Sequence, residues 1–83
     1  MFFKPKQIVN AKQFIATEEN FEEIYNWLDQ SYVVMFNPIK GRLNIIDSQD
    51  NEVTAFCDDY IIDRDGYVEV LRPNDFQKNY ICE

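Results

Sequence analysis

The chain contains no histidine among its 83 residues, and this absence excludes several kinds of active site. Serine and cysteine nucleophiles are commonly activated by a neighbouring imidazole, and many zinc sites use histidine as a ligand. Without that residue, neither a Ser/His/Asp nor a Cys/His arrangement can form. The sequence therefore predicts a protein that is not an enzyme and that uses no cofactor or metal.

Glycine and cysteine are also scarce, with two of each. Gly41 and Gly66 are too few to build a Walker A loop or a dinucleotide-binding fingerprint, both of which need several closely spaced glycines. Cys57 and Cys82 are far apart in the sequence. In a reducing compartment two free thiols are favoured over a disulfide, which remains the alternative.

No apolar run approaches the roughly 18 residues that a transmembrane helix needs. The start, Met-Phe-Phe-Lys-Pro-Lys, lacks the charged-then-apolar order of a signal peptide. We therefore expect the protein to be found in the cytoplasm.

Basic residues are few: 8 Lys and Arg stand against 15 Asp and Glu, for a net charge of −7. Surfaces that bind nucleic acid or anionic membranes need an excess of Lys and Arg. The sequence accordingly predicts neither a nucleic-acid partner nor a membrane partner.

Aromatic residues, by contrast, are plentiful at 16% of the chain, within a hydrophobic fraction of 46%. Large rings bury much area per residue, so one core can form without disulfides or metal. There is no repeat and no linker, and we expect residues 1–83 to form a single domain.

The clearest predicted element is a helix at about residues 18–30. Phe21, Ile24, Tyr25 and Leu28 have the i, i+3, i+4, i+7 spacing of one apolar stripe. Trp27 lies at the edge of that stripe and is expected to cover the seam between helix and sheet. Either Thr17 or Asn20 is suitable as the N-terminal cap.

Short β-prone runs separated by turn residues surround this helix. They predict strands at residues 7–15, 32–36, 42–47, 52–56, 60–62 and 67–71, followed by a short helical turn that begins at Pro73. The predicted fold class is α+β: a curved antiparallel or mixed sheet of about five to six short strands, with the helix packed on one face.

The segment Asp58–Tyr80 carries a pattern of its own. It reads Asp-Asp-Tyr-Ile-Ile-Asp-Arg-Asp-Gly-Tyr-Val-Glu-Val-Leu-Arg-Pro-Asn-Asp-Phe-Gln-Lys-Asn-Tyr. This resembles the closing segment of a family of small phage and prophage proteins of no established activity, which have a Gly-Asp-Trp/Tyr-Ile-Ile corner, a glycine-containing hairpin and a Pro-x-x-Phe-x-x-x-Tyr ending. The opening Ala-Lys-Gln-Phe and Glu-Asn-Phe-Glu-Glu are similar to that family as well. At the corner the chain departs from the pattern, because Cys57-Asp58-Asp59 stands where Pro-Gly-Asp is usual.

Each residue of this pattern also has a structural role available to it. Asp59 can accept backbone N–H groups across a corner, Tyr60 and Ile62 point to one face of a strand with Ile61 on the other, and Phe76 and Tyr80 can dock a short helix. The resemblance therefore implies a fold and a phage origin. The structural signature is Asp59, Tyr60, Ile62, Gly66, Pro73, Phe76 and Tyr80.

Two acidic motifs suggest chemistry only weakly. Asp58 with Asp59, and Asp63 with Asp65, are carboxylate pairs, but adjacent residues on a strand face opposite ways and a chain this small offers little cleft volume. The run Asp63–Gly66 has a faint likeness to a calcium loop, yet it lacks the further ligands of an EF-hand. A plain hairpin turn is the favoured interpretation.

The acidic surface is the feature that can carry a function. One hypothesis is that it only keeps a small domain soluble; the other is that it binds a host or phage protein that presents a basic surface. The candidate partner-binding residues are Glu19, Glu22, Glu23, Asp47, Asp50 and Glu52.

Two further hypotheses stand beside these. The protein can be a structural component that forms homo-oligomers by edge-strand pairing through Phe2-Phe3 or residues 33–36. A small-ligand pocket between helix and sheet, lined by Tyr25, Trp27 and Tyr60, is the third hypothesis.

Overall fold

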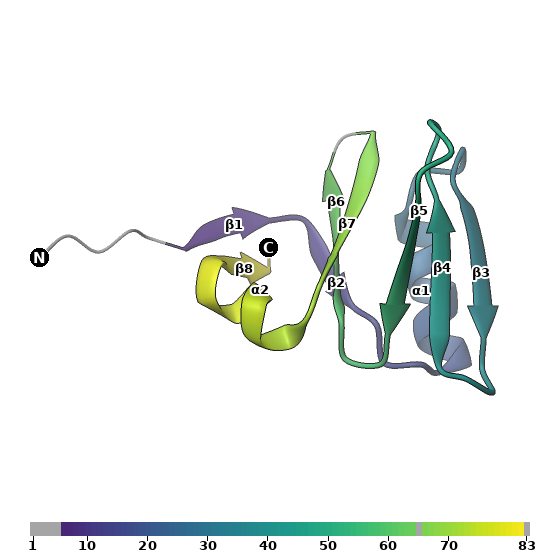
Figure 1. The fold of residues 1–83 in the computed structure, drawn as a ribbon, viewed down its shortest axis with the longest axis horizontal. Helices are drawn as coiled ribbons and strands as arrows, with labels where there is room; N and C mark the ends of the chain where they lie inside the picture. Colours follow the sequence, from purple (N-terminus) through teal and green to yellow (C-terminus); the bar gives the residue numbers. More distant parts are fainter. Residues whose placement is uncertain (1–5, 65, 83) are drawn as a thin grey trace, which may run out of the picture.

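The computed structural model describes residues 6–64 and 66–82 and has the predicted α+β fold (Figure 1). A ten-residue helix and a shorter C-terminal helix are combined with short strands. In chain order the elements are β1 (Gln7–Val9), β2 (Ala11–Gln13), α1 (Glu18–Trp27), β3 (Val33–Asn37), β4 (Arg42–Ile46), β5 (Glu52–Phe56), β6 (Tyr60–Arg64), β7 (Tyr67–Leu71), α2 (Pro73–Asn79) and β8 (Tyr80–Cys82).

The strands form three small sheets rather than the single curved sheet that the sequence suggested. Strands β3, β4 and β5 make an antiparallel meander, and β2, β6 and β7 make a second antiparallel sheet. Strands β1 and β8 pair in parallel and bring the two ends of the described chain together.

The predicted strand at residues 7–15 is divided in two at Asn10. The backbone carbonyl of Asn10 accepts the N–H of Asp63 at 2.9 Å, and its side-chain Oδ1 accepts the indole N–H of Trp27 at 3.1 Å. These contacts turn the chain, so that β1 pairs with β8 and β2 pairs with β6. The division, together with β8, explains why the structure has more strands than predicted.

Helix α1 begins after Thr17, whose hydroxyl accepts the N–H of Asn20 at 3.0 Å. Thr17 is therefore the cap. Asn20 lies inside the helix, where its buried side chain accepts the N–H of Ile15 and donates to the carbonyl of Gln13. The helix ends at Trp27, earlier than predicted, because Asp29 starts a turn by accepting the N–H of Ser31 at 2.8 Å.

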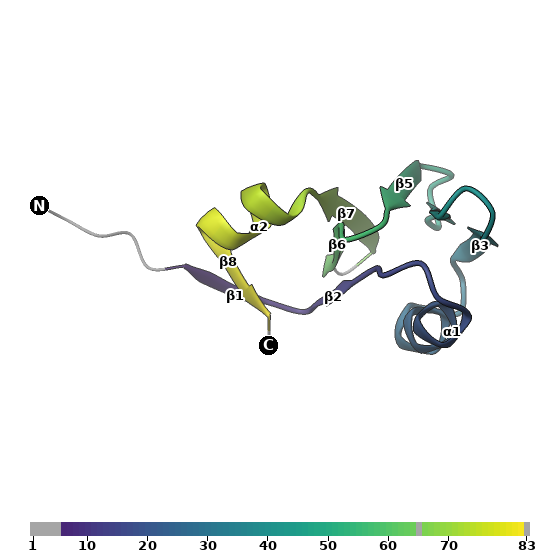
Figure 2. The ribbon, with the colours of Figure 1, turned by 90° about the horizontal axis from the view of Figure 1, so that it is seen from below.

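The main core lies under α1, which covers one face of the sheet β3-β4-β5 (Figure 2), and it also takes in buried residues of β6 and β7. Trp27 is half-buried against this core at the seam, as predicted. Tyr25, expected within the apolar stripe, is instead 46% exposed. The buried members of the main core are Phe14, Ile24, Leu28, Tyr32, Leu43, Ile45, Ala55, Ile61 and Val68.

A second, smaller core lies under α2 and consists of Val9, Ile62 and Phe76, with Tyr60 and Tyr80 packed against it. The rings of Tyr60 and Phe76 are stacked with centroids 4.1 Å apart. Strand β6 separates the two cores, because Ile61 points into the main core and Ile62 into the smaller one. This matches the alternation predicted for these residues.

The corner between β5 and β6 is held by Asp59. Its buried carboxylate accepts the N–H of Phe56 at 2.9 Å and forms an ion pair with Arg72. Asp58 has a φ of 80°, a left-handed conformation that glycine adopts most easily, and it occupies the position at which the phage pattern has glycine. The corner therefore places an aspartate in a backbone conformation that is strained for any residue other than glycine.

The remaining signature residues also occupy turn and docking positions. Gly66 has a φ of 108° in the turn between β6 and β7, and Pro73 is the first residue of α2. Tyr80 packs at 5.6 Å from Phe76 between ring centroids, and its hydroxyl accepts a hydrogen bond from Arg64. Asp65, part of the run that faintly resembled a calcium loop, lies outside the described residues.

Candidate functional site

The six candidate carboxylates do not form one surface. Glu19, Glu22 and Glu23 lie on α1, which covers one face of the sheet β3-β4-β5. Glu52 is directly opposite Ile46 on β4, and its side chain points to the other face of that sheet. Asp50 lies in the exposed connection between β4 and β5. The structure therefore separates a helical group from a turn group.

Asp47 differs from the other candidates because it is buried, with 6% of its surface exposed. Its carboxylate accepts the N–H groups of Gln49 at 2.8 Å and Asn51 at 3.0 Å. Burial alone would raise the pKa of Asp47, but the hydrogen bonds from Asn51 and Gln49 hold this pKa below the ordinary value for an aspartate. Asp47 stabilises the turn and is not part of the exposed acidic surface.

One flank of α1 is closed by β2. Lys12 forms an ion pair with Glu23 at 2.9 Å and lies 5.9 Å from the centre of the Trp27 ring. The indole of Trp27 in turn binds Asn10. The carboxylate of Glu23 therefore already has a basic partner within the domain.

The other flank of α1 is open and faces β3. Glu18 and Glu22 lie one helical turn apart on this side, next to Phe21 and Tyr25. No ion pair involves Glu18 or Glu22 within residues 6–64 and 66–82. The prediction did not include Glu18, although its i, i+4 spacing to Glu22 was visible in the sequence.

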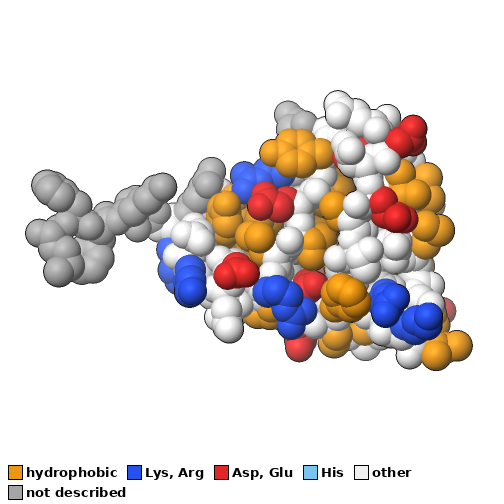
Figure 3. Space-filling model, in the orientation of Figure 1, with side chains coloured by type: hydrophobic (Ala, Val, Ile, Leu, Met, Phe, Trp, Pro, Cys, Tyr) orange, Lys and Arg blue, Asp and Glu red, His pale blue; other side chains and the backbone are white. Residues whose placement is uncertain are grey.

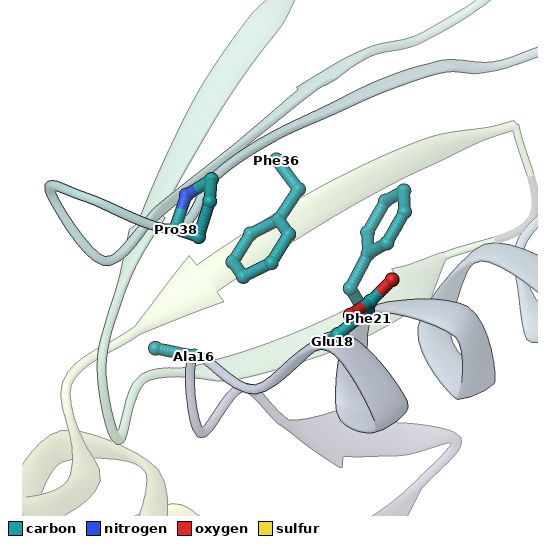
Figure 4. Close-up of a pocket in the computed structure, with 5 residues that line it drawn as sticks. All are labelled: Ala16, Glu18, Phe21, Phe36 and Pro38. Carbon is teal, nitrogen blue, oxygen red and sulfur yellow. The ribbon is translucent and has the colours of Figure 1, made fainter.

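Two adjoining pockets follow this open flank. The first, of about 370 Å³, is lined by Ala16, Glu18, Phe21, Phe36 and Pro38 (Figure 4). The second, of about 290 Å³, is lined by Phe21, Glu22, Tyr25 and Asn26. Because they share Phe21, we treat them as one surface and call it the α1–β3 groove.

Stacked aromatic rings form the floor of the α1–β3 groove. The ring of Phe36, at the end of β3, lies 5.2 Å from that of Phe21 at an interplanar angle of 16°. Phe21 in turn lies 6.0 Å from Tyr25. The groove therefore combines the exposed ring of Tyr25 and the half-buried rings of Phe21 and Phe36 with two carboxylates that have no described basic partner.

The outer face of the sheet β3-β4-β5 carries a small apolar patch. Val33 and Met35 are 52% and 48% exposed, and Ile46 is directly opposite Val33. Hydrophobic side chains gather over β3 and β4 on this face in Figure 3. The edge strand thus presents apolar side chains on the face opposite the groove.

The proposed ligand pocket between helix and sheet does not have the expected lining. Tyr60 stacks on Phe76 in the smaller core, whereas Trp27 packs on the main core and Tyr25 lines the α1–β3 groove. Tyr60 thus belongs to the smaller core, Trp27 to the main core and Tyr25 to the groove, so the structure does not bring the three rings together as predicted.

Asp58 and Asp59 do not share a site, and Asp65 of the second acidic pair lies outside the described residues. Asp59 is bound by Arg72 and a backbone N–H, while Asp58 is exposed. In the described part of the chain, no three Cys, Asp or Glu side chains converge as a metal site would require. Neither described helix is long and apolar enough to cross a membrane. Phe2 and Phe3, the other candidate contacts, lie outside the described residues.

Comparisons with known proteins found no match to this chain. No family model matches the chain, and neither a curated protein nor a solved structure matches it.

Proposed function

We propose that this is a small accessory protein encoded by a phage or prophage, which acts in the host cytoplasm by binding a protein partner and performs no catalysis. The phage origin rests on the likeness of Asp58–Tyr80 to small phage proteins. The binding role rests on the exposed carboxylates of α1, above all on Glu18 and Glu22 beside the aromatic rings of the α1–β3 groove.

Charge distribution supports α1 as the binding surface. The chain has a net charge of −7, and its first helix contains Glu18, Glu19, Glu22 and Glu23 but no basic residue. Lys12 forms an ion pair with one of these four glutamates, Glu23. Such a surface attracts a protein that presents Lys and Arg, and the attraction weakens as salt screens it.

The test is capture of a partner from infected host cells by tagged variants, followed by mass spectrometry. One variant replaces three glutamates of α1 that have no described ion pair, Glu18→Gln, Glu19→Gln and Glu22→Gln. The matched control replaces three exposed acids elsewhere, Asp50→Asn, Glu52→Gln and Asp58→Asn, and removes the same charge. Asn is chosen at positions 50 and 58 because both have positive φ, which Asn tolerates.

We expect the wild type and the control to retain one specific host or phage protein, and the helical variant to lose it. High salt should release the partner from the wild type. Equal retention by the two variants would contradict a role for the acidic helix. Thermal unfolding of both variants verifies that they are folded.

A further inference from the structure

Strand β3 is an open edge of its sheet. The order β3-β4-β5 leaves one side of β3 without a strand among the described residues. In an antiparallel pair, every second residue of an edge strand directs its N–H and C=O away from its neighbour. Proteins usually protect such edges with charged residues, proline or a bulge. Val33–Asn37 reads Val-Val-Met-Phe-Asn and contains no charged residue or proline.

The side chains of β3 divide between two different surfaces. Val34 and Phe36 point toward α1, while Val33 and Met35 point to the outer face of the sheet. A strand added beside β3 would continue this alternation. One row of its side chains would lie over the α1–β3 groove, and the other would lie beside the apolar patch of Val33, Met35 and Ile46.

The groove side favours cationic side chains. Glu18 and Glu22 supply two carboxylates, and the exposed ring of Tyr25 with the half-buried ring of Phe21 supplies π faces. A guanidinium or ammonium group can pair with a carboxylate and stack on such a ring at once. The outer face favours apolar side chains, because Val33 and Met35 are exposed there.

We propose that β3 is the docking edge for an extended segment of a partner protein whose side chains alternate between basic and apolar, with the basic row in the α1–β3 groove. The main-chain hydrogen bonds of such β-augmentation provide affinity, and the two side-chain rows provide specificity. This inference rests on the proposed function and assigns it a surface and a partner chemistry.

A second copy of the chain fits this edge poorly. Strand β3 has no basic residue to place beside Glu18 and Glu22. Pairing two β3 strands would also bring together two chains that each carry a net charge of −7. Like charges repel across such an interface, so charge complementarity selects a basic partner over self-pairing.

The first test uses blocked synthetic peptides titrated into the ¹⁵N-labelled protein and followed by NMR. The probe alternates arginine and valine over the length of β3. One control has the same composition with the arginines and valines in separate blocks, and a second carries N-methyl groups on alternate amides. We expect shifts in the amides of residues 33–37 and in α1, and affinity about tenfold weaker for each control peptide.

The second test compares two matched variants of the helix. Glu18→Gln with Glu22→Gln removes the carboxylates of the groove, whereas Glu19→Gln with Glu23→Gln removes the same charge from elsewhere on α1. We expect the first pair to weaken binding of the alternating peptide by about tenfold and the second by less than about twofold.

Several results would overturn the assignment. They are equal losses from the two variant pairs, equal affinity for the alternating and block peptides, peptide-induced shifts centred away from β3, or a dimer through β3 in analytical ultracentrifugation. Partner capture that depends on the α1 carboxylates, without peptide binding at β3, would overturn this inference and leave the proposed function standing. Capture that ignores those carboxylates would overturn the proposed function itself.

Discussion

At the scale of single residues, the carboxylates of this chain have two distinct roles. Asp47 and Asp59 are buried, and their carboxylates accept backbone N–H groups at a turn, two at Asp47 and one at Asp59. Glu18 and Glu22 lie on an open helix flank beside exposed rings. An acidic residue of this protein is therefore a candidate for partner binding only if its carboxylate oxygens do not already accept hydrogen bonds from the backbone.

The turn role of Asp47 predicts how stability depends on pH. Its pKa in the folded protein is below the ordinary value of about 3.9, so its stabilising effect is fully present above that value. The effect is lost as the pH falls through the lower, folded-state pKa. Comparing urea unfolding of the wild type and Asp47→Asn should give the largest difference near neutral pH and a small one near about pH 2. Parallel curves across this range would refute the prediction.

At the scale of elements, α2 is attached mainly by its aromatic contacts. Phe76 is stacked on Tyr60 and lies beside Tyr80, and the same small core contains Val9 from β1. Strands β1 and β8 therefore depend on the same few side chains as α2. The sheet β3-β4-β5 and α1 pack on the other core.

Replacement of Phe76 should thus weaken one end of the domain more than the other. We expect Phe76→Ala to lower the free energy of unfolding by about 3 to 5 kcal/mol, and Phe76→Leu by less. Hydrogen exchange should accelerate in β1, α2 and β8, while α1 and β3–β5 retain their protection in Phe76→Leu. A uniform acceleration across both cores would count against two separable packing units.

The elements that the sequence predicted well are those determined by local patterns. The stripe from Phe21 to Leu28 predicted α1, and Pro73 predicted the start of α2. The division of the first strand at Asn10 was not predictable in this way, because it depends on contacts with Trp27 and Asp63, which are distant in sequence. The parallel pairing of β8 with β1 is equally non-local.

Local patterns likewise predicted some residues of the candidate site, and non-local contacts account for the rest. Helical spacing correctly placed Glu19, Glu22 and Glu23 on the exposed side of α1. Helical spacing could not reveal that the Asp47 carboxylate accepts a backbone N–H of its own turn, or that Lys12 forms an ion pair with Glu23 on one flank of the helix. The groove itself follows from Phe36 of β3 stacking on Phe21, a contact that no local pattern contains.

At the scale of the whole molecule, excess negative charge opposes folding. The net charge is −7, and the ion pairs among the described residues include Lys12–Glu23, Arg64–Glu69 and Arg72–Asp59. Salt weakens both the attraction within these pairs and the repulsion among the remaining carboxylates. The repulsion involves more charges, so its screening should dominate.

We therefore expect the thermal midpoint of unfolding to rise as sodium chloride is increased from low concentration to about 0.5 M. Differential scanning calorimetry at neutral pH measures this directly. The Glu18→Gln, Glu19→Gln, Glu22→Gln variant, which carries less charge, should show a smaller rise. A midpoint that falls with salt would mean that the ion pairs outweigh the repulsion.

The parallel pairing of β1 with β8 also constrains how the protein is made. Val9 in β1 leaves the ribosome before the other described elements, but Tyr80–Cys82, the hydrogen-bonding neighbour of β1, is synthesised after all of them. The meander β3-β4-β5 and α1 can pack during translation, since their contacts are close in sequence. Strand β1 cannot form its hydrogen bonds to β8 until β8 has been synthesised, and the described fold is complete only then.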